Sequence, residues 1–318
     1  MKISIVIINY NGARCIPACI SSCVAEGVEA QDIVVVDNGS DDNSLALVRH
    51  GFPDVRIVAN ACNAGFARAV NQGLREAGQE LVLILNNDAR LQSGAVAHLI
   101  RCAERFPDAA LIGARLLDVQ QRPQNVVAPF PRVWHDLLPK FLLKRVLRSG
   151  PMGRMANVSE PMVVPTLIGA ALLLQRSVLP ILGLMDEDFF FYLEETEWCQ
   201  RAHGLGFTVL FCPEAGVEHD LGGTANRYRA AARIEFHRSR LIYAKKVDGL
   251  LAQRLLVLIL YLSSSINFLV NGVLTLGTLF LSRKLRQKTK MYGILWLWHS
   301  LGRPRNWGLP NKCPKEIS

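Results

Sequence analysis

Short apolar runs alternate with segments of helical periodicity along the first 117 residues of the chain. Continuous apolar strands separated by helices are typical of a parallel sheet that is covered by helices on both faces. The expected strands are 3–8, 32–36, 55–59, 81–85 and 109–117. The expected helices are 13–24, 41–50, 65–77 and the segment from an N-cap at Ser93 to Phe106. The alternation predicts an α/β fold.

Three of the expected strands end in short polar sequences. These are Asn9-Tyr10-Asn11, Asp37-Asn38-Gly39-Ser40 and Asn86-Asn87-Asp88. In open α/β sheets, ligands bind outside the carboxyl ends of the strands. A single polar end is equally well explained as the cap of the next helix, with Ser40 or Asp41 capping 41–50. Three together favour one ligand-binding crevice.

Asp88 is a candidate metal ligand because it combines a strand end with a neighbouring amide. Hard divalent cations that also hold phosphate oxygens often take only one or two ligands from the protein. Later in the chain, we expect a strand at 207–211 and a short strand or turn at 214–219. His219 is the last residue of this region. It is either a second metal ligand or a structural histidine.

Several acidic residues flank an aromatic block. They are Asp186 and Glu187 before Phe189-Phe190-Phe191, and Glu194, Glu195 and Glu197 after it. The dipole of an expected helix at 194–203 explains one or two acids at its start. The apolar block can also desolvate a carboxylate and raise its pKa toward the range of a general base.

Taken in series, these motifs resemble glycosyltransferase family 2, in the rhamnosyltransferase-like branch that builds bacterial surface polysaccharides. The resemblance covers residues 3–245 and is carried by VVVDNGSDD, NAGFARAVNQG, LILNNDA and GAALLLQRSVLPILGLMDEDFFFYLEETEWCQRAHGLGFTVLFCPEAGVEHDLGG. It implies a GT-A fold, in which a Rossmann-like nucleotide-binding sheet is fused to an acceptor-binding half. It also implies inverting sugar transfer from a nucleotide-sugar donor, with Mg²⁺ or Mn²⁺ as cofactor.

The resemblance assigns roles to particular residues. Asp88 becomes the metal-binding acid of an Asp-x-Asp-type motif, and His219 a residue that often completes the metal or diphosphate site. Glu195 stands where the family has its presumed catalytic base. The residues implied in donor binding are Tyr10, Asn11, Asp37, Asn38, Asn63, Gly65, Phe66 and Asn87.

Two positions depart from the family pattern. Asn86 replaces the first acid of the Asp-x-Asp motif, and one less charge weakens the expected metal affinity. Glu195 replaces the usual Asp, so the base is one methylene longer. This second departure leaves open whether Glu194 or Glu195 is the base.

The favoured function is transfer of rhamnose from dTDP-rhamnose to a lipid-linked or membrane-proximal saccharide. A polyprenyl-phosphate hexosyltransferase is one alternative. A non-catalytic scaffold that binds nucleotide sugars at the membrane is another. Metal-dependent turnover separates an enzyme from the scaffold.

The C-terminal third is basic and then apolar. Segment 227–246 is basic and expected to be helical, whereas the 28 residues 255–282 contain no charged side chain and could span a bilayer as one helix. A single span would place one basic flank outside, against the positive-inside rule. A hairpin broken near 263–267, or a pair of interfacial helices, keeps both flanks on the cytoplasmic side. A buried core pair is the remaining alternative.

We therefore expect three regions. A GT-A domain at 1–223 contains a variable excursion at 118–161, rich in proline and basic residues. A basic helical segment at 224–249 and membrane-associated apolar helices with a basic tail at 250–318 follow.

The net charge is +9, with 36 Lys and Arg against 27 Asp and Glu. This balance favours an anionic membrane surface as a partner. Nucleic acid is not expected, because the basic residues lie beside apolar helices and not in a stripe interleaved with aromatics. Cys15, Cys19 and Cys23 share one helix face, which argues against bridges among them and for a reduced setting. The expected location is the cytoplasmic face of the bacterial inner membrane.

Overall fold

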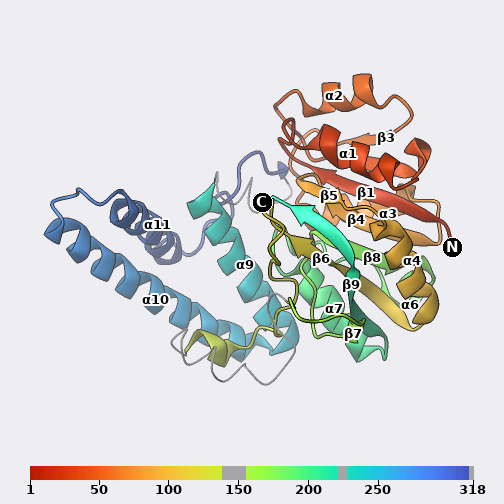
Figure 1. Ribbon diagram of the computed structural model, residues 1–318. Helices are drawn as coiled ribbons and strands as arrows, with labels where there is room; N and C mark the ends of the chain where they lie inside the picture. Colours follow the sequence, from red (N-terminus) through yellow and green to blue (C-terminus); the bar gives the residue numbers. More distant parts are fainter. Residues whose placement is uncertain (138–154, 221–227, 315–318) are drawn as a thin grey trace. The chain divides into compact units, whose positions relative to one another are not determined.

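The computed structural model describes residues 1–137, 155–220 and 228–314 (Figure 1). The chain divides into two compact units. The sheet unit consists of Met1–Phe130, Leu147–Phe190 and Glu194–Leu221, and the helical unit of Pro131–Val146, Phe191–Leu193 and Gly222–Ser318. The predicted basic cluster at Lys140, Lys144, Arg145 and Arg148 lies outside the described residues.

The sheet unit is built on a nine-stranded sheet within the described part of the chain. The strand order is β3-β2-β1-β4-β8-β6-β9-β5, and β7 pairs with β9. The strands are β1 (Ile3–Asn9), β2 (Ile33–Asp37), β3 (Arg56–Ala59), β4 (Leu81–Asn86), β5 (Ala89–Leu91), β6 (Ala109–Leu117), β7 (Met162–Val163), β8 (Ala171–Gln175) and β9 (Thr208–His219). The expected α/β class is confirmed.

The sheet is mixed, which corrects the prediction of an all-parallel sheet. Strands β1 to β4 pair in parallel, but β8 runs antiparallel to both β4 and β6. Because β8 is antiparallel to β4, it begins at the carboxyl end of β4. The backbone amide of Asn86 accordingly donates to the carbonyl of Ala170, at 3.0 Å. This pairing brings the chain before β8 to the polar end of β4.

Helices enclose the sheet because their apolar sides pack on branched aliphatic strands. The helices of this unit are η1 (Ala30–Asp32), α1 (Ile16–Ala25), α2 (Ser44–Gly51), α3 (Phe66–Glu76), α4 (Ala95–Arg105), η4 (Arg176–Val178), α6 (Leu179–Leu182) and α7 (Glu194–Gly204). Ile5, Val35 and Leu83 are fully buried in the centre of the sheet. Each such side chain contributes roughly 1.5–3 kcal/mol by its burial.

Both predicted helix caps are wrong. Helix α2 begins after Asn43, and Ser40 is used elsewhere, as described below. Helix α4 begins after Gly94, and its first amides, on Gly94 and Val96, donate to the carboxylate of Glu26 at 2.9 and 3.0 Å. The segments 207–211 and 214–219 also form one strand, β9, whose pairing with β6 is irregular at Ala114 and Arg115.

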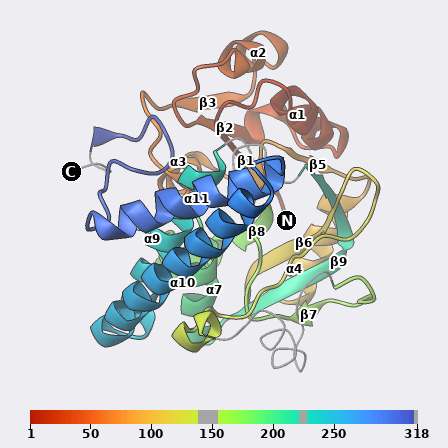
Figure 2. The same cartoon turned by 90° about the vertical axis from the view of Figure 1, so that its left-hand side faces the viewer.

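The helical unit contains η2 (Val133–Asp136), α9 (Arg229–Val247), α10 (Leu250–Gly277) and α11 (Arg283–Ser300). Figures 1 and 2 both show α10 and α11 side by side. The ring of Phe268 stacks on Trp296 at 5.8 Å, and the hydroxyls of Thr275 and Thr289 are hydrogen-bonded at 2.9 Å. These pairs show that α10 and α11 form an antiparallel hairpin.

Helix α10 runs unbroken through 263–267, so the predicted break there is wrong. Its polar side chains are satisfied inside the helix instead: Ser265 and Asn267 donate to carbonyls four residues earlier, at 2.9 and 2.8 Å. Asn271 and Thr275 do the same, each at 2.7 Å. This local pairing lets a helix accept polar residues without a break.

Helix α10 is not a buried core helix, which excludes that alternative. Among the described residues it is the one helix that is long and apolar enough to cross a membrane, by length and composition. Its polar residues Ser264, Asn271 and Thr275 are buried, while large apolar residues are exposed. The exposed set includes Leu251, Leu255, Leu258, Leu262, Ile266, Leu269, Val273 and Leu276. From Leu262 to Leu276 the helix therefore buries polar side chains and exposes apolar ones, whereas Leu256, Ile259 and Leu260 nearer its start are buried.

Candidate active site

The carboxyl ends of β1 and β2 meet in a buried hydrogen-bond network. The side-chain amide of Asn9 donates to Asp37 at 2.7 Å and to Ser44 at 2.9 Å. The hydroxyl of Ser40 donates to the Asp37 carboxylate at 2.7 Å. Asn87, after β4, donates to the Asn9 side-chain oxygen at 2.7 Å. Three polar strand ends are thus joined through Asn9, which the sequence placed in the first polar strand end but to which it assigned no role in donor binding.

Two residues beside this network have unusual surroundings. Asn11 has a positive φ of 53°, and its side-chain oxygen accepts from the amide of Asp41 at 2.9 Å. Gly12 lies so close to the network that a Cβ would meet the Asn87 amide nitrogen at 2.1 Å. A glycine is needed there for the backbone to pass. Tyr10, between β1 and Asn11, is partly buried.

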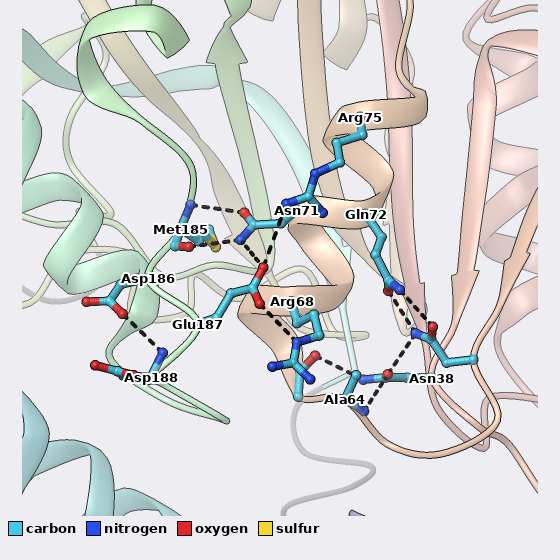
Figure 3. A network of polar contacts seen from close by, with 12 residues as sticks. Asn38, Ala64, Arg68, Asn71, Gln72, Arg75, Met185, Asp186, Glu187 and Asp188 are labelled. Atoms are coloured by element: carbon cyan, nitrogen blue, oxygen red, sulfur yellow. Dashed lines mark hydrogen bonds and ion pairs between the residues drawn. The ribbon is translucent and has the colours of Figure 1, made fainter. Parts of the chain in front are cut away.

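Asn38 organises a second network one residue after β2. Its oxygen accepts from the amide of Ala64 at 2.9 Å, and its nitrogen donates to Asn63 at 3.0 Å and to the Gly65 carbonyl at 3.1 Å. Asn60 and Gln72 extend it through two mutual amide bonds of 2.8 Å (Figure 3). The loop before α3 is therefore fixed to the end of β2.

The loop before α3 also contacts the aromatic block. The amide of Phe66, the first residue of α3, donates to the carbonyl of Phe190 at 2.7 Å. Gly65 has a φ of 85°, and a Cβ there would meet the same carbonyl oxygen at 2.7 Å. Glycine is required by both the backbone conformation and the close approach.

Asp88 and His219 are brought together by the pairing of β5 with β9. Nε2 of His219 lies 3.3 Å from Oδ1 of Asp88, and both side chains are largely buried. The amide of Asp220 donates to the Asp88 carbonyl at 3.0 Å, which fixes the backbone on both sides of the contact. The two residues predicted to hold a metal therefore lie next to each other.

A carboxylate and an imidazole at this separation suit a divalent cation that keeps phosphate or water as its other ligands. In residues 1–137, 155–220 and 228–314, no group of three or more His, Cys, Asp and Glu side chains is placed to hold a metal. Among the described residues, the candidate ligands are therefore Asp88 and His219. A cavity of about 480 Å³ adjoins His219, and its polar lining also includes Gln124, Asn125 and Arg122.

Glu194 and Glu195, at the start of α7, are carboxyl groups with raised pKa values. Glu194 is buried, and one of its carboxylate oxygens has no hydrogen-bond partner among the described residues. Burial, together with the neighbouring charge of Glu195, raises the pKa of Glu194 well above its ordinary value. Burial also raises the pKa of Glu195 to about 7, although backbone hydrogen bonds, including one with Gly169, partly oppose this.

Glu195 lies near the polar end of β4. A Cβ on Gly169 would be 3.6 Å from the Cβ of Glu195, and Ala170 next to it accepts from the Asn86 amide. The antiparallel entry of β8 thus places a carboxyl group with a pKa near neutrality beside the Asn86-Asn87-Asp88 turn. A group of this kind can exchange a proton with a substrate at neutral pH.

The remaining acids of the cluster are engaged structurally. Glu187 accepts from Arg68 at 2.9 Å and from Asn71 at 3.0 Å, and Asn71 also binds both backbone groups of Met185 (Figure 3). Burial raises the pKa of Glu187, and these hydrogen bonds lower it by more. The net effect is a pKa below the ordinary value of a glutamate. Glu187 fastens the loop before α7 to α3.

Glu197 and Asp186 also have local partners. Glu197 forms an ion pair with Arg201 one turn later, at 2.8 Å. Asp186 accepts from the amide of Asp188 at 3.0 Å. Among the five acids singled out from the sequence, Glu194 and Glu195 are the two with raised pKa values.

The chain is similar to known glycosyltransferases. The model of glycosyl transferase family 2 matches residues 4–180. The N-acetylglucosaminyl-diphospho-decaprenol L-rhamnosyltransferase of Mycobacterium tuberculosis is 25% identical over 230 residues, covering 66% of this chain and 73% of the relative. The low-salt glycan biosynthesis hexosyltransferase Agl10 of Haloferax volcanii is 26% identical over 271 residues, covering 81% of each chain.

A solved structure shows the same fold. The mannosyltransferase PcManGT from Pyrobaculum calidifontis, in complex with GDP-Man and Mn²⁺, matches with a TM-score of 0.51 at 17% identity. The match covers 95% of this chain and 86% of that chain. The expected GT-A architecture is thereby confirmed.

Proposed function

The chain belongs to glycosyl transferase family 2, an inverting class, and we propose that it transfers a sugar from a nucleotide-sugar donor to a lipid-linked saccharide. The single observation that carries the proposal is Glu195, a carboxyl group with a pKa of about 7 beside the polar end of β4. The donor would lie over the ends of β1 and β2, where Asp37 and Asn38 are buried and held in place.

Glu195 acts as the general base. In its deprotonated form it removes a proton from the acceptor hydroxyl, and that oxygen attacks the anomeric carbon. The attack comes from the face opposite the diphosphate, so the bond to the diphosphate breaks as the new bond forms and the configuration inverts. Burial and the neighbouring charge of Glu195 hold the pKa of Glu194 well above its ordinary value, so we assign the role of base to Glu195.

Asp88 and His219 are the residues that would hold a divalent cation. When bound, Mg²⁺ or Mn²⁺ supplies positive charge that neutralises the leaving diphosphate. The nucleotide side is provided by Tyr10, Asn11 and the Asn38 network, with Asn63 and Gly65 in the loop before α3.

We propose L-rhamnose as the sugar and dTDP-rhamnose as the donor. The support is the sequence resemblance to rhamnosyltransferases together with the named activity of the M. tuberculosis relative. That relative also acts on a decaprenol-linked saccharide by its name, which supports a lipid-linked acceptor.

A lipid-linked acceptor requires that the enzyme reach a membrane, and α10 supports this. Its exposed leucines, isoleucine and valine would be stable against lipid and unfavourable in water. Exposed basic residues at the start of α11, Arg283, Lys284 and Arg286, follow the apolar turn Leu279–Leu281. We propose that this hairpin binds the cytoplasmic face of the inner membrane, where basic residues meet anionic lipid headgroups.

The test is sugar transfer by the purified full chain. Radiolabelled dTDP-rhamnose, UDP-sugars and GDP-sugars are each supplied with polyprenyl-diphosphate saccharides and Mn²⁺, and lipid-soluble label is measured. We expect transfer from dTDP-rhamnose that is lost on chelation and in Asp88→Ala. Transfer onto polyprenyl phosphate itself would favour the hexosyltransferase alternative, and donor binding with no transfer or donor hydrolysis would favour the scaffold.

Membrane binding is tested separately by sedimentation with vesicles that contain anionic or only zwitterionic lipids. We expect binding to anionic vesicles, weakened at least tenfold by Ile266→Lys combined with Val273→Lys. Equal binding of the variant and the unchanged chain would contradict a role for α10.

A further inference from the structure

Gln124 is a buried side chain that contacts the candidate metal-binding histidine twice. It is 6% exposed. Its amide nitrogen donates to the His219 carbonyl at 2.6 Å and to the Leu117 carbonyl at 3.3 Å. Its amide oxygen faces Nδ1 of His219 at 3.2 Å. Every polar atom of the Gln124 side chain is therefore engaged at the ends of β6 and β9.

These contacts determine which nitrogen of His219 carries the proton. The two carbonyl acceptors fix the orientation of the amide, because a flipped amide would place its oxygen against two other oxygens. An amide oxygen can only accept, so Nδ1 of His219 must donate to it. In the neutral ring, the proton on Nδ1 leaves a lone pair on Nε2.

Nε2 is the atom that lies 3.3 Å from Oδ1 of Asp88. Two acceptor atoms that face each other at this distance repel each other unless a cation lies between them. The backbone of His219 is fixed by its pairing with Ala89, but this pairing does not select a tautomer. Gln124 is the described side chain that does so.

We infer that Gln124 is a positioning residue: it holds His219 in the Nδ1–H tautomer and so presents Nε2, together with Asp88, to the divalent cation. The inference rests on the proposed function, because it deepens the role given to Asp88 and His219. Partners of this kind, behind a metal-binding histidine, typically change metal affinity by about 10–100-fold when they are removed.

The first experiment measures Mn²⁺ affinity of the full chain, with Mn²⁺ alone, by the electron paramagnetic resonance signal of free Mn²⁺. Gln124→Met has a similar volume but cannot accept from Nδ1. We expect its dissociation constant for Mn²⁺ to rise about 10–100-fold. The matched control is Gln175→Met, since Gln175 is also buried and donates to two backbone carbonyls, those of Phe106 and Ala109, at 3.0 and 2.8 Å. The control should bind Mn²⁺ within about twofold of the unchanged chain, as expected for a change that affects only stability.

A conservative variant separates positioning from packing. Gln124→Glu keeps an oxygen that accepts from Nδ1, and it should retain Mn²⁺ affinity within about threefold even though it loses donors to the carbonyls. Gln124→Asn withdraws the oxygen by one methylene, and it provides the loss-of-acceptor test if Gln124→Met does not fold. Equal losses in the Glu and Met variants would overturn the inference, because they would reflect packing alone.

The tautomer is observed directly by nitrogen-15 nuclear magnetic resonance of ring-labelled histidine in the metal-free chain. The His219 signals are those that disappear in His219→Ala. We expect a protonated Nδ1 in the unchanged chain, and a mixture of tautomers in Gln124→Met. A protonated Nε2 with a bare Nδ1 in the unchanged chain would overturn the inference.

Failure of the inference can be distinguished from failure of the metal site itself. If His219→Ala and Asp88→Ala leave Mn²⁺ affinity unchanged, the proposed metal ligands are wrong. If those variants lose affinity while Gln124→Met and Gln124→Asn do not, only the role of Gln124 is overturned.

Discussion

The two sides of the candidate site are built on opposite principles. On the nucleotide side, Asn9, Asp37 and Asn38 are buried, and their polar side-chain atoms have hydrogen-bond partners at 2.7–3.2 Å. On the reaction side, Glu194 has an unpartnered oxygen and Glu195 a pKa of about 7. Satisfied networks give a rigid, preorganised surface for binding, whereas a poorly stabilised carboxylate gives a reactive one.

This difference has a cost in stability on the reaction side. Ionising Glu195 in the folded protein is harder than in the unfolded chain, since its pKa is raised from 4.5 to about 7. At about 1.4 kcal/mol for each pKa unit, the penalty above pH 7 is roughly 3 kcal/mol. Substitutions on the reaction side should therefore change mainly kcat. Substitutions on the nucleotide side should change mainly donor affinity and the free energy of unfolding.

The largest effect is expected from removing the base. Glu195→Gln should lower kcat by more than about 10³-fold, because the side chain can no longer accept a proton. Donor affinity, measured by titration calorimetry, should stay within about twofold of the unchanged chain, since the nucleotide side is intact. Glu194→Gln leaves the proposed base in place, so we expect a loss of less than about tenfold. If Glu194→Gln inactivates the enzyme and Glu195→Gln does not, the assignment of the base is wrong.

The pH dependence should reveal the same carboxyl group. A base with a pKa of about 7 is deprotonated above that value, so kcat should be flat at higher pH and fall about tenfold per pH unit below it. At pH 5 the loss is about 100-fold. A profile that stays flat down to pH 5 would contradict a base with a raised pKa, provided that the chain remains folded there.

The stability of the protein should change with pH in the opposite direction. A raised pKa means that the folded state holds the proton more tightly, so this stabilisation is fully present below about pH 4.5 and is lost as pH rises through about 7. Comparing Glu195→Gln with the unchanged chain isolates this contribution. As pH rises from about 4.5 to above 7, the unchanged chain should lose roughly 3 kcal/mol more of its free energy of unfolding than Glu195→Gln does. Urea unfolding of both chains measures this difference.

A smaller effect is expected on the nucleotide side. Asn38→Ala removes four hydrogen bonds that fix the loop before α3, so donor affinity should fall about tenfold and unfolding free energy by about 2 kcal/mol. At saturating donor, kcat should remain within about threefold. Gln79→Ala is a suitable control, because Gln79 donates to Asp32 at the amino end of the sheet. A large loss of kcat with unchanged donor affinity in Asn38→Ala would break the proposed division of roles.

Five of the strands, and the three polar ends, could be predicted from the sequence because most of their side chains are buried. The strand predicted at 109–117 matches β6 residue for residue, and 81–85 differs from β4 only by Asn86. The three polar ends also meet as predicted. Parallel pairing of β1 with β2 and β4 aligns their carboxyl ends, so sequence position was sufficient.

The helix starts could not be predicted, because a local cap competes with partners that are distant in sequence. Ser40 bonds Asp37 and receives a bond from Asn11 instead of capping α2. At α4, Glu26 from the chain after α1 replaces the predicted cap Ser93. Local propensity gives the candidate in both cases, and tertiary contacts decide which residue is used.

Our choice between Glu194 and Glu195 as the proposed base rests on the structure. Both precede the same helix, and their spacing from the aromatic block differs by one residue. What separates them is the direction of each side chain, since Glu194 is buried while Glu195 adjoins Gly169 at the start of β8. The antiparallel placement of β8 was not visible in the sequence, so neither was this distinction.

The smallest effect is expected at Glu187, an acid close to Glu195 in sequence but engaged by α3. Glu187→Gln should lower the unfolding free energy by no more than about 1 kcal/mol, because the pair with Arg68 is partly exposed and screened by solvent. The pKa of Glu187 is lowered, so its contribution is present at neutral pH and is lost as pH falls through that lowered pKa. Urea unfolding at neutral and acidic pH measures it, and kcat should stay within about twofold. If Glu187→Gln instead lowered kcat as strongly as Glu195→Gln, a carboxylate with a lowered pKa would be as necessary for turnover as one with a raised pKa. The direction of the pKa shift would then no longer distinguish structural carboxylates from reacting ones in this site.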